Sequence, residues 1–67
     1  MPVPDLREWE FSEYKDSITA RLTDEEFEDT IKVAEIQLQL EDNKFVAGNI
    51  RKAIYDIKRR REAIKNA

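Results

Sequence analysis

Residues 23–40 place their apolar side chains at helical spacing on two separate stripes. At about 100° per residue, the first stripe contains Phe27, Ile31, Ala34 and Leu38, and the second, nearly opposite, contains Val33, Ile36 and Leu40. A helix on the surface of a small protein needs only one such stripe, which faces the core. We therefore expect this helix to be packed on both sides, by other parts of the chain or by a second protein.

The start of this helix is marked by a capping box between Thr23 and Glu26. The hydroxyl of Thr23 can accept a hydrogen bond from the amide of Glu26, whose carboxylate can accept one from the amide of Thr23. The acidic residues that follow Thr23 favour the positive end of the helix dipole. Leu22 and Phe27 stand at the positions of a hydrophobic staple. The sequence thus predicts that a helix starts at residue 23.

A second long helix is predicted at about 44–65, after the polar break Glu41-Asp42-Asn43. Its apolar stripe contains Val46, Ile50, Ala53, Ile54, Ile57 and Ile64. Two helices joined by so short a loop run antiparallel. We predict an all-α fold, an antiparallel helical hairpin of about 23–41 and 44–65, in which the second helix covers the stripe that contains Phe27.

The segment before the hairpin is predicted to contain a short helix at about 13–22, capped by Ser12. One face of that helix would carry Phe11, Tyr14, Ile18 and Leu22. Residues 1–11 are expected to form an N-terminal arm, and residues 12–67 a single helical domain. Residues 5–11 suit either a helical turn or a strand, but a lone strand has no partner, so we favour a turn or an irregular arm.

Charge is divided sharply between the two ends of the chain. Residues 1–42 contain 13 Asp and Glu against 4 Lys and Arg, a net charge of −9, whereas residues 43–67 contain 2 against 8, a net charge of +6. The two values account for the net charge of −3 of the whole chain. Such asymmetry indicates either acid–base pairing inside the molecule or a charged partner.

Composition argues against catalysis and metal binding. The chain has no Cys and no His, so it lacks thiolate ligands, disulfides and the commonest general base. The carboxylates of residues 24–29 fan around one helical end, where they complement the dipole rather than converge on a cation. We predict no catalytic residue, no metal site, no cofactor and no enzymatic activity. A chain of 67 residues buries only about 60% of its unfolded surface, so self-association or a larger partner is the remaining source of stability.

No apolar run approaches the about 20 residues that span a membrane. The N-terminal sequence MPVPDLREWEF has no basic segment followed by an apolar one, so it does not resemble a signal peptide. We therefore expect a cytoplasmic protein with no membrane partner.

The predicted partner-binding residues are Val33, Ile36, Leu40, Trp9 and Phe11. The first three form the second stripe, which is free unless the preceding segment covers it. Trp9 and Phe11 either dock onto the chain's own core or contribute to a partner contact. The sequence thus favours a small non-enzymatic interaction module, a regulator, inhibitor or accessory subunit. It would bind a protein partner or a second copy, with the charged ends setting orientation and encounter rate.

Two alternatives involve nucleic acid. The basic 44–65 helix carries exposed candidates for phosphate contact with some base stacking, Arg51, Tyr55, Lys58, Arg59 and Lys65. The acidic residues 1–42 would be repelled by phosphate, which weighs against this function. Those same acidic residues could instead mimic nucleic acid and occupy a basic groove of another protein.

Overall fold

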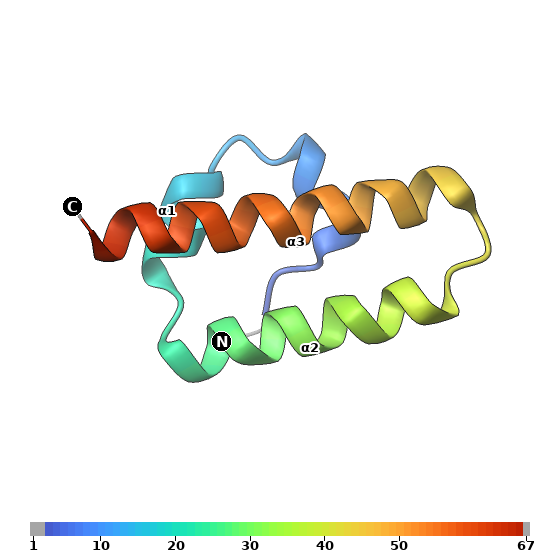
Figure 1. Cartoon of the computed structure of the whole chain (residues 1–67). Helices are drawn as coiled ribbons and strands as arrows, with labels where there is room; N and C mark the ends of the chain where they lie inside the picture. Colours follow the sequence, from blue (N-terminus) through green and yellow to red (C-terminus); the bar gives the residue numbers. More distant parts are fainter. Residues whose placement is uncertain (1–2, 67) are drawn as a thin grey trace.

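The computed structural model describes residues 3–66, and within that range the chain forms helices and no strand. The elements are a 3₁₀ helix η1 (Leu6–Phe11) and three α-helices, α1 (Lys15–Arg21), α2 (Asp24–Leu40) and α3 (Lys44–Lys65). The all-α class predicted from the sequence is confirmed. In Figure 1, α2 and α3 lie side by side and run in opposite directions, joined by the loop of residues 41–43.

Both long helices begin with side-chain caps. The Thr23 hydroxyl accepts a hydrogen bond from the Glu26 amide (3.1 Å), and the Glu26 carboxylate accepts one from the Thr23 amide (2.9 Å), which confirms the capping box. That bond to the Thr23 amide lowers the pKa of Glu26. At the start of α3, the Asn43 side chain accepts from the amides of Phe45 and Val46. Local sequence therefore determines where α2 and α3 begin.

The centre of the molecule is α3, which contacts each of the other helices. In Figure 1 it crosses the middle of the molecule, with α2 below it and η1 and α1 above and behind it. Its buried face contains Ala47, Ile50, Ala53 and Ile57, of which Ile50 and Ile57 are completely buried. The expectation that α2 is packed on both sides was wrong within this chain, because η1 and α1 pack chiefly on α3.

The inward stripe of α2 is the predicted one. Ile31 and Ala34 are buried, and Phe27 and Leu38 pack against the same core while half-buried. Thr30 is buried between them and donates its hydroxyl hydrogen to the Glu26 carbonyl (2.7 Å). That internal bond allows a polar residue to lie in an apolar interface.

Part of the N-terminal segment packs into the core. Leu6 and Trp9 are 1% and 3% exposed, and both join the cluster that contains Ile50 and Ile57. Residues three apart lie on one side of a 3₁₀ helix, so η1 can bury both side chains at once. Residues 1 and 2 of the predicted arm lie outside the described part of the chain.

The short helix α1 starts later than predicted. Ser12 does not cap it; its backbone amide donates to the Trp9 carbonyl (3.1 Å) and closes η1. The helix begins at Lys15, after Tyr14, which makes no side-chain cap. The separate turn of η1 therefore interrupts the periodicity that suggested one continuous face.

The predicted face of the short helix is only partly correct. Ile18 packs against the core and Leu22 is buried, but Phe11 and Tyr14 are exposed. The inward position is taken by Thr19, which is completely buried and donates to the Lys15 carbonyl (2.7 Å). None of the helices in residues 3–66 is long and apolar enough to cross a membrane.

Candidate interaction surfaces

The second stripe of α2 faces solvent. Val33, Ile36 and Leu40 are 39%, 57% and 76% exposed, and we call these three residues the α2 ridge. Neither η1 nor α1 covers the ridge. Because the opposite side of α2 is fixed against α3, the ridge side chains project from a helix that is already ordered.

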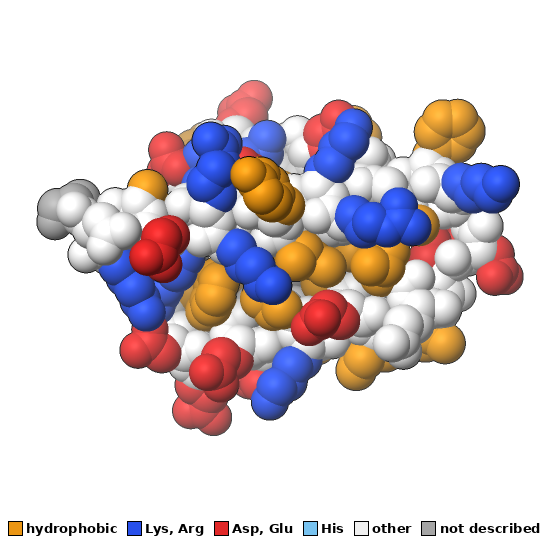
Figure 2. Space-filling view, in the orientation of Figure 1, with side chains coloured by type: hydrophobic (Ala, Val, Ile, Leu, Met, Phe, Trp, Pro, Cys, Tyr) orange, Lys and Arg blue, Asp and Glu red, His pale blue; other side chains and the backbone are white. Residues whose placement is uncertain are grey.

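Exposed acidic side chains share α2 with the ridge and lie mostly towards the N-terminus of the helix. Lys32 is the one exposed cation of α2, whereas five of its carboxylates are exposed: Asp24, Glu25, Glu28, Asp29 and Glu35. Figure 2 shows acidic side chains gathered over the first half of α2, at the lower left, and hydrophobic ones over its second half, at the lower right. The surface that carries the predicted partner contact is therefore both aliphatic and negative.

A groove runs along the other side of the molecule, between α3 and the segment that joins η1 to α1. It encloses about 580 Å³. Its floor includes the buried Trp9 and Ala53. Its rim includes Lys15, Arg51, Lys52, Tyr55 and Arg59. We call this feature the α3 groove.

The α3 groove contains three of the five nucleic-acid candidates. Arg51, Tyr55 and Arg59 line it, and the ring of Tyr55 is 70% exposed. Lys58 and Lys65 are exposed on α3 but do not line the groove. Sequence periodicity did not indicate that Lys15 and Lys52 would join the set, because the rim depends on how α1 meets α3.

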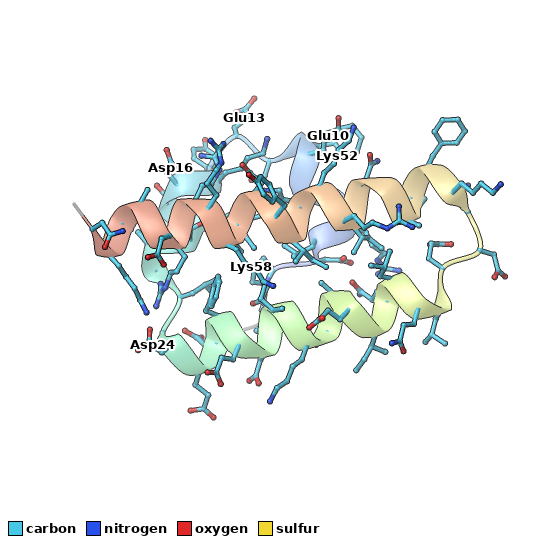
Figure 3. The ribbon with its side chains drawn as sticks, in the orientation of Figure 1. Glu10, Glu13, Asp16, Asp24, Lys52 and Lys58 are labelled. Carbon is cyan, nitrogen blue, oxygen red and sulfur yellow. The ribbon has the colours of Figure 1, made fainter. Side chains whose placement is uncertain are left out.

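Acidic groups also border the α3 groove. Glu10 and Asp56 are among the residues that line it. In Figure 3, Glu10, Glu13 and Asp16 follow the upper edge formed by η1 and α1, on the same side of α3 as Lys52. The groove is therefore basic in net charge but carries both signs.

Asp56 holds the floor of the groove together. Its carboxylate accepts hydrogen bonds from Trp9 Nε1 (2.9 Å), Arg60 Nε (2.8 Å) and Arg59 Nη2 (3.3 Å). Burial raises the pKa of Asp56, but these donors outweigh burial and lower the pKa to about 2. Arg60 also pairs with Asp16 of α1. Helical periodicity did not indicate this role of Asp56, although an acidic residue isolated within a basic helix is visible in the sequence.

Trp9 and Phe11 are only two residues apart but lie in different environments. Trp9 is buried with its indole hydrogen bonded, so it supports the core and does not present its ring to a partner. Phe11 is 77% exposed and lines a second groove with Pro4 and Ile18. Of the two, only Phe11 is accessible to another molecule.

Arg61 joins three helices and is structural. Its Nη1 donates to the carbonyls of Thr19 (2.8 Å) and Leu22 (2.7 Å), and its Nη2 donates to Asp24 (2.8 Å). The guanidinium lies 5.4 Å from the ring centroid of Phe27. The hydrogen bond from Arg61 lowers the pKa of Asp24. We refer to this arrangement as the Arg61 clamp; the sequence had suggested only that the stem of Arg61 covers the edge of the core.

Neither the arrangement of acidic side chains nor similarity to known proteins indicates a further site. Among residues 3–66, no group of three or more acidic side chains is arranged to hold a metal ion. No family model, no curated protein and no solved structure matches the chain. Proposals about function therefore depend on the α2 ridge and the α3 groove themselves.

Proposed function

We propose that this chain is a small non-enzymatic interaction module that binds a protein partner through the α2 ridge. The observation that carries the proposal is the exposure of Val33, Ile36 and Leu40 on one line of an ordered helix. Burying aliphatic surface is a main favourable term in protein association. Contiguous apolar patches with polar borders are typical of interaction sites.

The surroundings of the ridge support this function. The helix that presents it is held by the core, so binding does not require that α2 become ordered. The exposed carboxylates of α2 would speed encounter with a basic partner and disfavour acidic ones. Such a module would act by occupying a surface, as a regulator, inhibitor or accessory subunit. We propose the cytoplasm as its compartment, because a chain without cysteine suits reducing conditions.

Photo-crosslinking in the native host tests the proposal. A photoreactive residue replaces Ile36 in one variant and Ala20, an exposed residue of α1, in a control variant. We expect a discrete crosslinked protein from position 36 and none from position 20. Equal crosslinking at both positions would contradict the proposal.

A substitution experiment adds a matched control. Ile36→Asp places a charge on the ridge, and Gln39→Asp places the same charge on an exposed position of the same helix outside it. Ile36→Asp should abolish crosslinking from a second ridge position, Leu40, while Gln39→Asp should preserve it. Circular dichroism should show that both variants remain folded, because neither residue is buried.

Nucleic-acid binding by the α3 groove is the second candidate. It is favoured by one observation: Arg51, Tyr55 and Arg59 line the same groove as Lys15 and Lys52, which combines cations with an aromatic ring. Fluorescence anisotropy with labelled single-stranded RNA and DNA tests it. Micromolar or tighter binding that weakens steeply with salt would favour this candidate over the interaction module.

A further inference from the structure

We infer that the α2 ridge of one copy docks into the α3 groove of a second copy, so that copies of this chain associate head to tail. The inference rests on the proposed function and names the partner of the ridge. Three properties carry it: the shapes of the two surfaces, their charges, and their positions on different faces of the molecule.

The ridge is short enough to lie within the length of the groove. At about 1.5 Å per residue, Val33 to Leu40 spans about 10 Å along α2. By the same measure, the part of α3 that lines the groove, Asn49 to Arg60, spans about 16 Å. A row of side chains on one helix packs naturally into a depression along another. The exposed ring of Tyr55 offers contact for aliphatic side chains.

The charges of the two surfaces are complementary. On α2, five exposed carboxylates, one of them paired with Arg61, outnumber Lys32. Around the groove, five basic side chains outnumber two acidic ones. The minority charges also correspond, since Lys32 beside the ridge can pair with Glu10 beside the groove. Docking therefore places opposite charges together without requiring either surface to be uniform in sign.

Charge also separates this arrangement from its competitors. Two ridges packed on each other would bring the carboxylates of both α2 helices together, and like charges across an interface are unfavourable. Nucleic acid offers only negative groups, which would lie near Glu10 and Asp56 in the groove. A helix that carries both carboxylates and a lysine can pair with the basic and the acidic side chains of the groove.

The ridge and the groove belong to different surfaces, so the contact is heterologous. Each copy that uses its ridge keeps a free groove, and association continues beyond the dimer unless a ring closes. Three aliphatic side chains form a contact smaller than the about 800 Å² per partner of a standard interface. We therefore expect weak association that depends on concentration and becomes about tenfold weaker as salt screens the exposed charges.

Analytical ultracentrifugation of the pure chain with two complementary variants tests the inference. Ile36→Asp removes the ridge and leaves the groove intact. The double variant Arg51→Glu/Lys52→Glu reverses the charge of the groove rim and leaves the ridge intact. A control, Lys58→Glu/Lys65→Glu, makes the same charge change on exposed positions of α3 outside the groove.

The expected results are specific to head-to-tail docking. The unmodified chain and the control associate at about 1 mM protein in low salt, whereas each of the other two variants is monomeric. An equimolar mixture of those two variants forms dimers and nothing larger, because only one intact ridge and one intact groove can meet. Circular dichroism confirms that all the variants fold.

Several outcomes would overturn the inference. They are an unmodified chain that is monomeric under these conditions, a double variant that still self-associates, or a mixture that stays monomeric. The second outcome would indicate pairing of two ridges. Loss of RNA binding in the double variant, without loss of association, would assign the groove to nucleic acid. If position 36 crosslinks to a different protein while the pure chain is monomeric, the proposed function stands and the inference fails.

Discussion

The two stripes of α2 have similar composition but different environments. Ile31 and Ile36 lie five residues apart on one helix, yet Ile31 is 9% exposed and Ile36 is 57% exposed. The difference is that α3 covers the first stripe, while nothing in residues 3–66 covers the second. Helical spacing shows which side chains share a face, but it does not show whether that face has a partner in the same chain.

The same contrast applies to the charged side chains of α3. Arg60 and Arg61 are tied to Asp16, Asp56 and Asp24, whereas Arg59 is 67% exposed and makes only one long bond. Part of the charge asymmetry in the sequence is therefore used inside the fold, and part remains at the surface. Side chains that make contacts inside the fold and side chains that remain exposed should therefore respond differently to substitution.

The largest effect is expected from the matched pair Ile31→Ala and Ile36→Ala. Removing the buried side chain should lower the free energy of unfolding by about 2 to 4 kcal/mol, because transfer and cavity terms add. The exposed partner should lose less than about 1 kcal/mol. Urea denaturation followed by circular dichroism measures both. Equal losses would remove the distinction between the stripes.

The next largest loss of stability is expected from Arg61→Met, which compares a largely buried arginine of α3 with an exposed one. It leaves the buried carbonyls of Thr19 and Leu22 without their donor, for which we expect about 2 to 3 kcal/mol of lost stability. Arg59→Met, the exposed control, should stay within about 0.5 kcal/mol of the unmodified chain. Thermal unfolding compares the pair. A neutral Arg61→Met would show that the clamp is dispensable.

Acid should destabilise the fold through Asp56. Its pKa is lowered from 3.8 to about 2, so the unfolded chain binds the proton more readily than the folded one. Stability is complete above about pH 4 and falls as the pH drops towards 2, by ~2 kcal/mol for this group. Lowered pKa values at Asp5, Asp24 and Glu26 act in the same direction. Denaturation measured between about pH 6 and about pH 2 should show a shallower decline for Asp56→Asn.

The smallest effect, and the only gain, is expected at Gly48. A Cβ added there meets nothing within 4 Å, so a methyl group fits at this position without a clash. Gly48→Ala should stabilise the helix by about 0.5 to 1 kcal/mol, because glycine loses more backbone freedom on folding. A rise in the melting temperature checks this. A decrease would reveal a close neighbour at that position.

Local features of the fold were predictable from the sequence. The capping box at Thr23, the polar break before α3 and the inward stripe of α2 all depend on residues within a few positions of one another. The exposed ridge was named as a candidate for the same reason. The all-α class follows from these long periodic segments.

Features that depend on distant contacts were not predictable. The indole of Trp9 finds the Asp56 carboxylate across 47 positions, and Arg61 reaches Thr19 across 42. Neither pairing leaves a periodic signal. The same limitation led to Trp9 being grouped with Phe11, and to α2 rather than α3 being taken as the helix packed on two sides. The groove rim was missed because it joins residues of separate elements.

The position of α3 in the chain has a consequence for biosynthesis. Residues 3–43 are made before the helix on which η1, α1 and α2 all pack. During translation Leu6, Trp9 and Ile31 therefore emerge before Ile50 and Ile57, the residues of α3 that complete their core. The complete core can form only after residues 44–65 have been made.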